Sequence, residues 1–171
     1  MNIVLIGMRG SGKTAVGKLL AEKLGKQFIE MDELITERVG LSIPEIVRKY
    51  GWEKFREVEE EITCEVARLD NVVNATGGGV VTREKNVREL EKKGELVWLK
   101  ASLDTLISRV GDDPSRPSLT GRSLREDMET VLAERSPIYE RASDFMIDTE
   151  GKTAQEVAEE IVKRYTEEGF I

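Results

Sequence analysis

The chain opens with a short apolar run followed by a glycine-rich segment, and this pair constrains the fold more than any other feature. Residues 7–14 read GMRGSGKT, which matches the pattern G-x-x-x-x-G-K-[ST]. In that pattern glycines let successive backbone N–H groups face phosphate oxygens at the start of a helix. Ile3 to Ile6 supply the buried strand before the loop, and apolar residues at helical spacing continue to Leu24. These flanks favour a phosphate-binding loop over an ordinary glycine turn.

The rest of the sequence alternates strand and helix patterns. Further strands are expected at residues 26–31, 71–76, 96–99 and 145–147, and helices at 32–39, 44–50, 52–69, 83–93, 102–110, from 123 to 135, and from 153 onward. Gly94 should close the helix at 83–93, and Pro137 should break the helix that begins at Ser123. Such alternation predicts an α/β fold with a parallel sheet, helices on both faces and one domain over residues 1–171.

Composition excludes several classes of function. The 26 Lys and Arg against 33 Asp and Glu give a net charge of −7, which disfavours a nucleic acid as partner. The longest apolar runs fall well short of the ~20 residues needed to cross a membrane, and the first is too short for a signal peptide, so a cytoplasmic protein is expected. Cys64 is the single cysteine and histidine is absent, so any general base must be a carboxylate, a lysine or a tyrosine.

Two further features should meet the glycine loop at the carboxyl edge of the sheet, where ligands bind in folds of this kind. Glu30 and Asp32 lie at the end of the second expected strand, and Gly77 to Gly79 follow the third. Lys13 would neutralise the β and γ phosphates, and the Thr14 hydroxyl would hold Mg²⁺. One carboxylate could reach a magnesium-bound water while the other accepts a hydroxyl proton, although a helix cap is the alternative for Asp32.

Three arginines could complete a site for anions. Arg56 and Arg135 lie on expected helices, where a lone arginine is usually solvated, but two guanidinium groups aimed at one pocket would bind a carboxylate. Arg116 lies in a long loop at residues 111–121 and could close over the phosphates, or remain a solvated loop residue. The chain lacks the Asn-Lys-x-Asp guanine reader of GTP-binding switches, which favours phosphoryl transfer to a small acceptor.

With these elements in one order, the chain resembles the shikimate kinases, P-loop kinases related to nucleoside-monophosphate kinases that phosphorylate the 3-hydroxyl of shikimate with MgATP. The glycine loop alone is generic, but the combination is specific and covers essentially the whole chain. The matching elements are Gly7 to Thr14, Asp32, Gly51-Trp52-Glu53-Lys54-Phe55-Arg56, Ala75-Thr76-Gly77-Gly78-Gly79-Val80, Arg116-Pro117 and Arg135-Ser136-Pro137-Ile138-Tyr139.

The resemblance implies a P-loop NTPase fold, a three-layer αβα sandwich with five parallel strands in the order 2-3-1-4-5. It also implies a substrate-binding region around residues 32–60, a mobile lid around 111–123, and a monomer. By the same resemblance, Asp32 contacts the shikimate hydroxyls and accepts the proton. The carboxylate of shikimate would be bound by Arg56 and Arg135, with backbone contacts from Gly78 and Gly79.

The same resemblance implies the nucleotide and metal sites. Lys13 and Arg116 would stabilise phosphate charge during transfer, and Arg109 would lie against the adenine. The implied ATP-binding residues are Gly10, Ser11, Gly12, Lys13, Thr14, Ala15, Arg109 and Arg116. Thr14 would ligate one Mg²⁺, with Glu30 reaching it through water.

The chain departs from the family pattern at three places. Glu30 stands where the family commonly has an aspartate, Ser118 replaces a leucine of the lid, and Glu150 to Lys152 replace an arginine and proline near the adenine. Two alternatives stay open from the sequence alone. One is a related kinase for another small hydroxy acid such as gluconate, and the other is a P-loop module that binds nucleotide as a regulatory switch without transferring phosphate.

Overall fold

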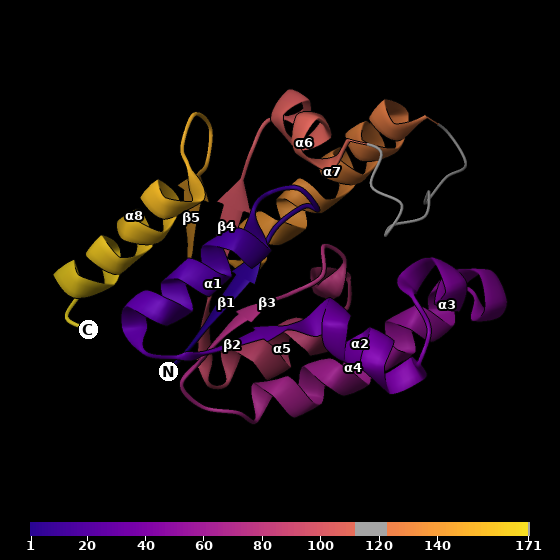
Figure 1. The fold of residues 1–171 in the computed structure, drawn as a ribbon, viewed down its shortest axis with the longest axis horizontal. Coiled ribbons are helices and arrows are strands. Elements are labelled where there is room, and N and C mark those ends of the chain that lie inside the picture. The colour runs from indigo at the N-terminus through magenta and orange to yellow at the C-terminus, as the bar shows by residue number, and fades with distance from the viewer. Residues whose placement is uncertain (112–122, 171) are drawn as a thin grey trace.

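The computed structural model describes residues 1–111 and 123–170. Its centre is a parallel sheet in the order β2-β3-β1-β4-β5, which confirms the α/β prediction and the strand order (Figure 1). The strands are β1 Asn2–Ile6, β2 Gln27–Glu30, β3 Val72–Ala75, β4 Gly94–Lys100 and β5 Phe145–Asp148. Because all the pairings are parallel, every strand ends at the same edge of the sheet.

Helices connect consecutive strands and cover both faces of the sheet. They are α1 Lys13–Leu24, α2 Met31–Val39, α3 Ile43–Tyr50, α4 Trp52–Ala67, α5 Glu84–Glu91, α6 Leu103–Val110, α7 Leu124–Ala142 and α8 Ala154–Glu167, with a short 3₁₀ turn, η1, at Val80–Thr82. Within the described ranges, no helix is both long and apolar enough to cross a membrane.

The pleat of β1 divides the core into two clusters. Ile3 and Leu5 face α1 and α8, which lie side by side on one face of the sheet (Figure 1). Val4 and Ile6 face the opposite way and pack in the cluster that includes residues of α4, α5 and α7. Each fully buried aliphatic side chain contributes about 1.5–3 kcal/mol by leaving water. The three-layer αβα arrangement is therefore confirmed, and the two cores hold the carboxyl edge of the sheet in place.

The prediction that Pro137 breaks its helix is wrong, because α7 continues through Pro137 to Ala142. Proline removes one backbone donor, which would otherwise bond the carbonyl of Ala133. Packing outweighs that loss: Tyr139, two residues beyond, is 0% exposed and fixes the second half of the helix in the core. The side chain of Ser136 also donates to the Leu132 carbonyl at 2.6 Å, in the turn before the proline.

The prediction that Gly94 closes a helix is wrong as well. Helix α5 ends at Glu91, and Gly94 is the first residue of β4, paired with Asn2 of β1. A Cβ atom at Gly94 would lie 3.1 Å from the Val4 side chain and 3.2 Å from the Asn2 carbonyl. The glycine is therefore used to bring two strands together rather than to end a helix.

Candidate active site

The glycine loop follows β1 and wraps around the start of α1, as its pattern predicts. Gly10 and Gly12 have φ values of +85° and +97°, which side chains with a Cβ rarely adopt. A Cβ at Gly10 would also lie 2.7 Å from the Val110 side chain, so the loop packs directly against the end of α6. The amino end of α1 thereby faces the carboxyl edge of the sheet, where its backbone N–H groups favour an anion.

Lys13 is buried within the loop it belongs to. Its ammonium donates to the carbonyl of Gly7 at 2.5 Å and to that of Met8 at 2.9 Å. These bonds satisfy the charge of a side chain that is only 8% exposed. The loop thus holds a largely buried cation at the amino end of α1.

A first hollow, here called the donor hollow, opens above this loop. Its walls are formed by Arg9, Gly10, Gly12, Lys13, Thr14, Ala15, Glu30, Asp32, Ala75, Thr76, Gly78 and Arg109. The Thr14 hydroxyl donates to Glu30 Oε1 at 3.3 Å. Burial raises the pKa of Glu30, and the nearby Glu33 raises it further. The convergence of hydroxyl and carboxylate oxygens here is the donor set that Mg²⁺ prefers.

Arg109 joins α6 to the glycine loop. Its guanidinium donates to the carbonyls of Gly10 and Ser11 and to the Thr149 hydroxyl, each at 3.3 Å. Glu150, one of the departures from the family pattern, accepts from Ser102 Oγ at 2.9 Å at the start of the same helix. Glu150 therefore joins the segment after β5 to the beginning of α6, whose far end carries Arg109.

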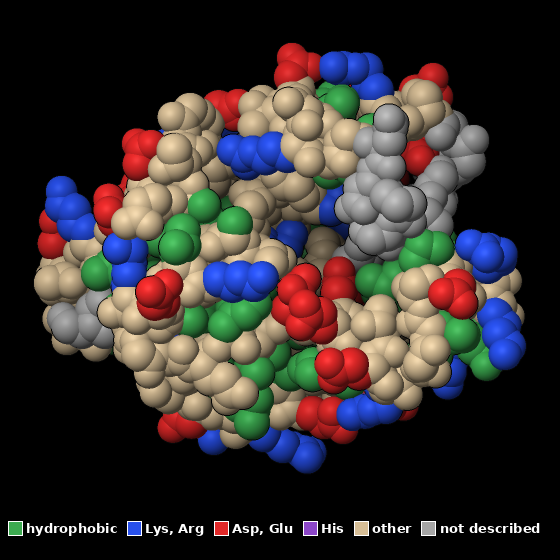
Figure 2. Space-filling model, viewed as in Figure 1, with side chains coloured by type: hydrophobic (Ala, Val, Ile, Leu, Met, Phe, Trp, Pro, Cys, Tyr) green, Lys and Arg blue, Asp and Glu red, His purple; other side chains and the backbone are tan. Residues whose placement is uncertain are grey.

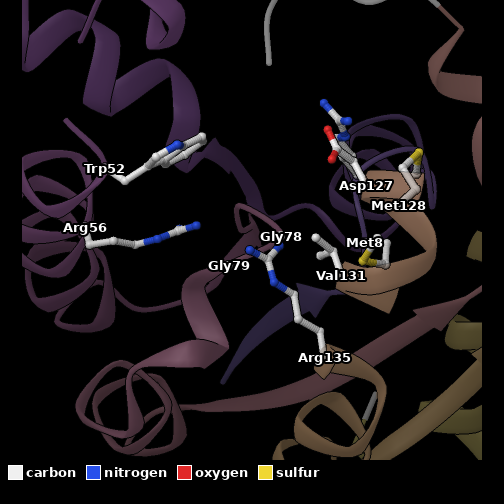
Figure 3. A pocket seen from close by; sticks show the side chains of 10 residues that line it. Met8, Trp52, Arg56, Gly78, Gly79, Asp127, Met128, Val131 and Arg135 are labelled. Carbon is white, nitrogen blue, oxygen red and sulfur yellow. The ribbon is translucent and has the colours of Figure 1, made fainter. Parts of the chain in front are cut away.

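A second hollow, the acceptor hollow, lies between α4 and α7. It is lined by Met8, Arg9, Trp52, Arg56, Gly78, Gly79, Asp127, Met128, Val131 and Arg135. Figure 3 shows the Arg56 side chain reaching in from α4 and that of Arg135 from α7, toward the glycine turn between them. Both arginines therefore line the same hollow.

Arg56 and Arg135 interact with different neighbouring groups. Arg56 Nη1 donates to Glu59 Oε1 at 2.9 Å, and Glu59 is 1% exposed. The Arg56 guanidinium also lies 5.5 Å from the centre of the Trp52 ring. Burial lowers the pKa of Arg135, Tyr139 opposes that shift, and the neighbouring positive charge of Arg56 adds to it. Because arginine begins with a very high pKa, Arg135 keeps its charge at neutral pH, and the crowding of two cations favours an anion between them.

The glycine turn after β3 fits between these side chains. A Cβ at Gly79 would overlap the guanidinium of Arg56, and one at Gly78 would lie 3.3 Å from Arg135 Nη1. The buried hydroxyl of Tyr139 donates to the Gly78 carbonyl at 2.6 Å. Close approach of arginine to backbone, rather than looseness of the chain, explains glycine at these two positions.

The two hollows adjoin, since Arg9 and Gly78 line both. The donor hollow spans about 950 Å³ and the acceptor hollow about 460 Å³, solvent at their mouths included. Figure 2 shows a hollow near the centre of the view, with Lys and Arg atoms in its depth and Asp and Glu side chains on its rim. A larger hollow beside the glycine loop thus adjoins a smaller one lined by arginines, an arrangement suited to two anionic ligands placed end to end.

Most residues expected at the site line one of these hollows, but Ser11, which is 2% exposed, lines neither. Arg116 and nearly all of the expected lid at 111–123 lie outside the described residues. The sequence prediction missed Asp127, which is 3% exposed in the acceptor wall, and it missed Arg9. Asp127 lies eight residues before Arg135, about two helical turns, so it shares the same face of α7. This spacing is the sequence feature from which Asp127 could have been predicted to lie near Arg135.

Comparison with known proteins agrees with this geometry. A family model described as shikimate kinase matches residues 9–166. Two similar proteins are shikimate kinases from Thermodesulfovibrio yellowstonii, 46% identical over 96% of this chain and 94% of the relative, and from Moorella thermoacetica, 48% identical over 94% and 91%.

Solved structures give the same result. A shikimate kinase from Acinetobacter baumannii, solved in complex with shikimate, superposes with a TM-score of 0.95 at 32% identity, covering 99% of this chain and 95% of the other. The enzyme from Aquifex aeolicus superposes with a TM-score of 0.85 at 34% identity, covering 98% of both chains. With its P-loop NTPase fold, its paired hollows and a family match over nearly its full length, this chain belongs to the shikimate kinase family.

Proposed function

We propose that the chain transfers the γ-phosphoryl group of ATP to the 3-hydroxyl of shikimate, giving shikimate 3-phosphate and ADP, a step in aromatic amino-acid biosynthesis. The observation that carries this proposal is the meeting of the two hollows at Gly78, with a phosphate loop on one side and two arginines on the other. Membership of the family supports shikimate as the acceptor, and ATP as the donor.

On the donor side, the backbone from Gly10 to Ala15 surrounds the phosphates. Lys13 exchanges its bonds to the loop carbonyls for bonds to the β and γ phosphate oxygens, where its charge stabilises the transferring group. Arg109 lies beside the nucleotide at the wall of the same hollow. Arg116 is proposed, from the sequence, to add a further positive charge from a lid around residues 111–123.

On the acceptor side, Arg56 and Arg135 bind the carboxylate of shikimate as two guanidinium donors, and Gly78 and Gly79 give it close backbone contacts. Asp32 lines the donor hollow beside the loop. In this proposal Asp32 binds the hydroxyl that attacks and accepts its proton as the new phosphorus–oxygen bond forms. The attack breaks the bond between the γ-phosphorus and the bridging oxygen, whose electron pair leaves with ADP.

The residues present fit a magnesium ion. Thr14 supplies a hydroxyl oxygen, and Glu30, 3.3 Å from it, supplies a carboxylate that can reach a metal-bound water. When bound, the ion would neutralise charge on the β and γ phosphates. Glu30 is longer than the aspartate common in the family, so its backbone can lie one bond farther from the ion and still serve.

We further infer that residues 1–171 act as one kinase domain, with its substrate-binding region around 32–60, and that the protein works as a cytoplasmic monomer without nucleic-acid or membrane partners. One continuous sheet with a core on each face supports a single domain. The substrate-binding region corresponds to α2, α3 and the first half of α4.

The deciding experiment measures ADP release with shikimate, quinate, gluconate and AMP offered as separate acceptors. Release that depends on shikimate, with shikimate 3-phosphate identified by mass, supports the proposal. Turnover with gluconate alone would show that the chain is a kinase for a different hydroxy acid. Nucleotide binding without any acceptor-dependent turnover would show that it is a nucleotide-binding regulatory switch. An Asp32→Asn protein in the same assay controls for contaminating kinases.

A further inference from the structure

Tyr139 ends the run Arg135-Ser136-Pro137-Ile138-Tyr139, and the proposed roles give it no part in the reaction. It lies on α7 with 0% exposure, and the centre of its ring is 5.8 Å from that of Trp98 on β4. A phenylalanine ring would pack in the same way. The hydroxyl, however, is a buried polar group, which costs free energy unless it forms hydrogen bonds. The hydroxyl therefore needs an explanation of its own.

The Tyr139 hydroxyl is bonded to the glycine turn after β3. It donates to the Gly78 carbonyl at 2.6 Å. That carbonyl belongs to the same peptide unit as the N–H of Gly79, and the unit is planar and trans, so the two groups point in opposite directions. The bond to Tyr139 therefore fixes the N–H of Gly79 to face away from the tyrosine. Because Gly79 lines the acceptor hollow, one hydroxyl sets the direction of a backbone donor in its wall.

The same tyrosine lies beside Arg135, which is four residues earlier and so on the same face of α7. Burial lowers the pKa of Arg135. Of the groups that oppose this shift Tyr139 has the largest effect, through the partial negative charge of its oxygen and a side-chain hydrogen bond. Because a guanidinium can only donate, the tyrosine oxygen is the acceptor in that interaction. The hydroxyl thus donates to the glycine turn and accepts from the arginine.

Arg135 and the glycine turn are also in direct contact. A Cβ built on Gly78 would lie 3.3 Å from Arg135 Nη1, so the guanidinium lies next to the glycine. Figure 3 shows the end of the Arg135 side chain beside Gly78 and Gly79. Tyr139, Gly78 and Arg135 therefore form a closed group in which each member contacts the other two.

We propose that Tyr139 is a positioning residue for the acceptor carboxylate, whose hydroxyl holds the guanidinium of Arg135 and the N–H of Gly79 in the relative orientation that binds it. The inference rests on the proposed function and deepens it. Tyr139 lines neither hollow, so it acts through these two groups. Donors that are already fixed in their bound arrangement lose little conformational freedom when the ligand arrives, which strengthens binding. Since the carboxylate is unchanged by phosphoryl transfer, the hydroxyl affects acceptor binding and not the chemical step.

A hydroxyl that served folding alone would give a different result. Its loss would lower the free energy of unfolding and leave the KM of shikimate unchanged, as expected for a buried tyrosine elsewhere in the protein. Tyr165 provides the matched control. It is also 0% exposed, but it packs in the core cluster on the other face of the sheet, with residues of α1 and α8.

The test compares Tyr139→Phe with Tyr165→Phe in steady-state assays, with urea unfolding of both. Tyr139→Phe keeps the ring against Trp98, so the protein should fold. We expect the KM of shikimate to rise about tenfold, the effect of lost hydrogen bonds at a charged group, with kcat within about twofold and the KM of ATP unchanged. Tyr165→Phe should leave all three values unchanged. A KM of shikimate that stays within twofold of the wild type in Tyr139→Phe, or a kcat that falls as much as KM rises, would overturn the inference.

A double-mutant cycle tests whether the hydroxyl acts through Arg135. Tyr139→Phe is introduced into the wild type and into Arg135→Met, and kcat/KM for shikimate is taken from rates well below KM, where weak binding does not prevent the measurement. The loss of about tenfold in the wild type should shrink to less than about threefold beside Arg135→Met. Equal losses in both backgrounds would overturn the inference, while wild-type turnover with shikimate would still support the kinase. A wild-type protein without shikimate-dependent turnover would overturn the proposed function itself.

Discussion

Gly79 and the guanidinium of Arg56 occupy adjoining space, so that a methyl group on Gly79 would overlap the arginine. The φ and ψ of Gly79 are −96° and 4°, values that residues with a Cβ also adopt. Glycine is therefore required at position 79 because a Cβ atom would overlap the arginine, and not because the backbone conformation excludes other residues. The turn after β3 sets where the guanidinium of α4 can lie, although the two elements are distant in the sequence.

Gly79→Ala should therefore act on the acceptor site alone. The added Cβ displaces Arg56 from the carboxylate, and losing a hydrogen bond to a charged group costs about 1.5–3 kcal/mol, so the KM of shikimate should rise roughly ten- to a hundredfold. A double-mutant cycle with Arg56→Lys checks the cause. If Gly79→Ala is equally harmful with and without Arg56, the two residues are not coupled and the steric explanation fails.

Asp32→Asn should stop transfer while nucleotide still binds. The amide cannot accept the hydroxyl proton, so kcat should fall by about 10²–10⁴, the usual contribution of a general base. The Kd of ATP, measured by fluorescence or calorimetry, should change less than twofold. Asp104→Asn, which breaks an exposed ion pair with Arg125, is the matched control. Retention of more than a tenth of the wild-type kcat would place the proton acceptor elsewhere.

Glu59→Gln should weaken acceptor binding through Arg56. Glu59 is 1% exposed and accepts from Arg56 Nη1 at 2.9 Å, so a neutral amide leaves the arginine without its buried counter-charge. We expect a higher KM for shikimate and a loss of about 1–3 kcal/mol in the free energy of unfolding, measured with urea. Glu57→Gln, at an exposed position on the same helix, should leave both values unchanged. Identical results for the two variants would remove Glu59 as a positioning residue.

Pro137→Ala should stabilise the protein. Alanine restores the backbone donor inside α7 and improves helix propensity, and the gain of about 1–2 kcal/mol outweighs the extra freedom of the unfolded chain. Urea denaturation measures the change. Pro44 lies in the first turn of α3, where the backbone donor has no helical partner, so Pro44→Ala should give no such gain. Destabilisation of similar size in both variants would show that the ring of Pro137 itself is needed for packing.

Glu30→Gln should raise the magnesium concentration needed for half-maximal rate, because an amide attracts a metal-bound water less than a carboxylate does. For Glu30→Asp this magnesium concentration should stay closer to the wild-type value, as expected if glutamate and aspartate serve the same role at this position. Glu37→Gln removes an exposed carboxylate of the same helix, α2, and serves as the control. A magnesium dependence that is the same for Glu30→Gln and Glu37→Gln would exclude Glu30 from the metal site.

The order of the elements could be predicted because the sequence carries it in local patterns. Continuous apolar runs indicated β1 and β4, and the pairs Ser42–Glu45 and Thr153–Glu156 form capping boxes at the expected helix starts. Pro137 and Gly94 were misread because their usual local effect was overridden by tertiary packing. The buried Tyr139 carries α7 past the proline, and the contact with β1 requires glycine at the start of β4.

The candidate site was predictable where motifs fix a role and unpredictable where a role depends on neighbours from other elements. The loop lysine and Asp32 follow from short patterns. By contrast, Asp127 looks like an ordinary charged residue in the first turns of a helix, and its 3% exposure depends on the tertiary surroundings of α7 at the wall of the acceptor hollow. Arg9 stands at a variable position of the loop pattern, so the pattern says nothing about its side chain.

The bonds of Lys13 bear on the proposed reaction cycle. With its ammonium on the carbonyls of Gly7 and Met8, the residue is 8% exposed and largely shielded from water. In the proposed reaction, an entering phosphate would exchange those bonds for its own, and when ADP departs the ammonium would return to the carbonyls rather than remain as an unpaired buried charge. The loop would thus compete with the nucleotide for its own lysine and weaken the binding of ADP.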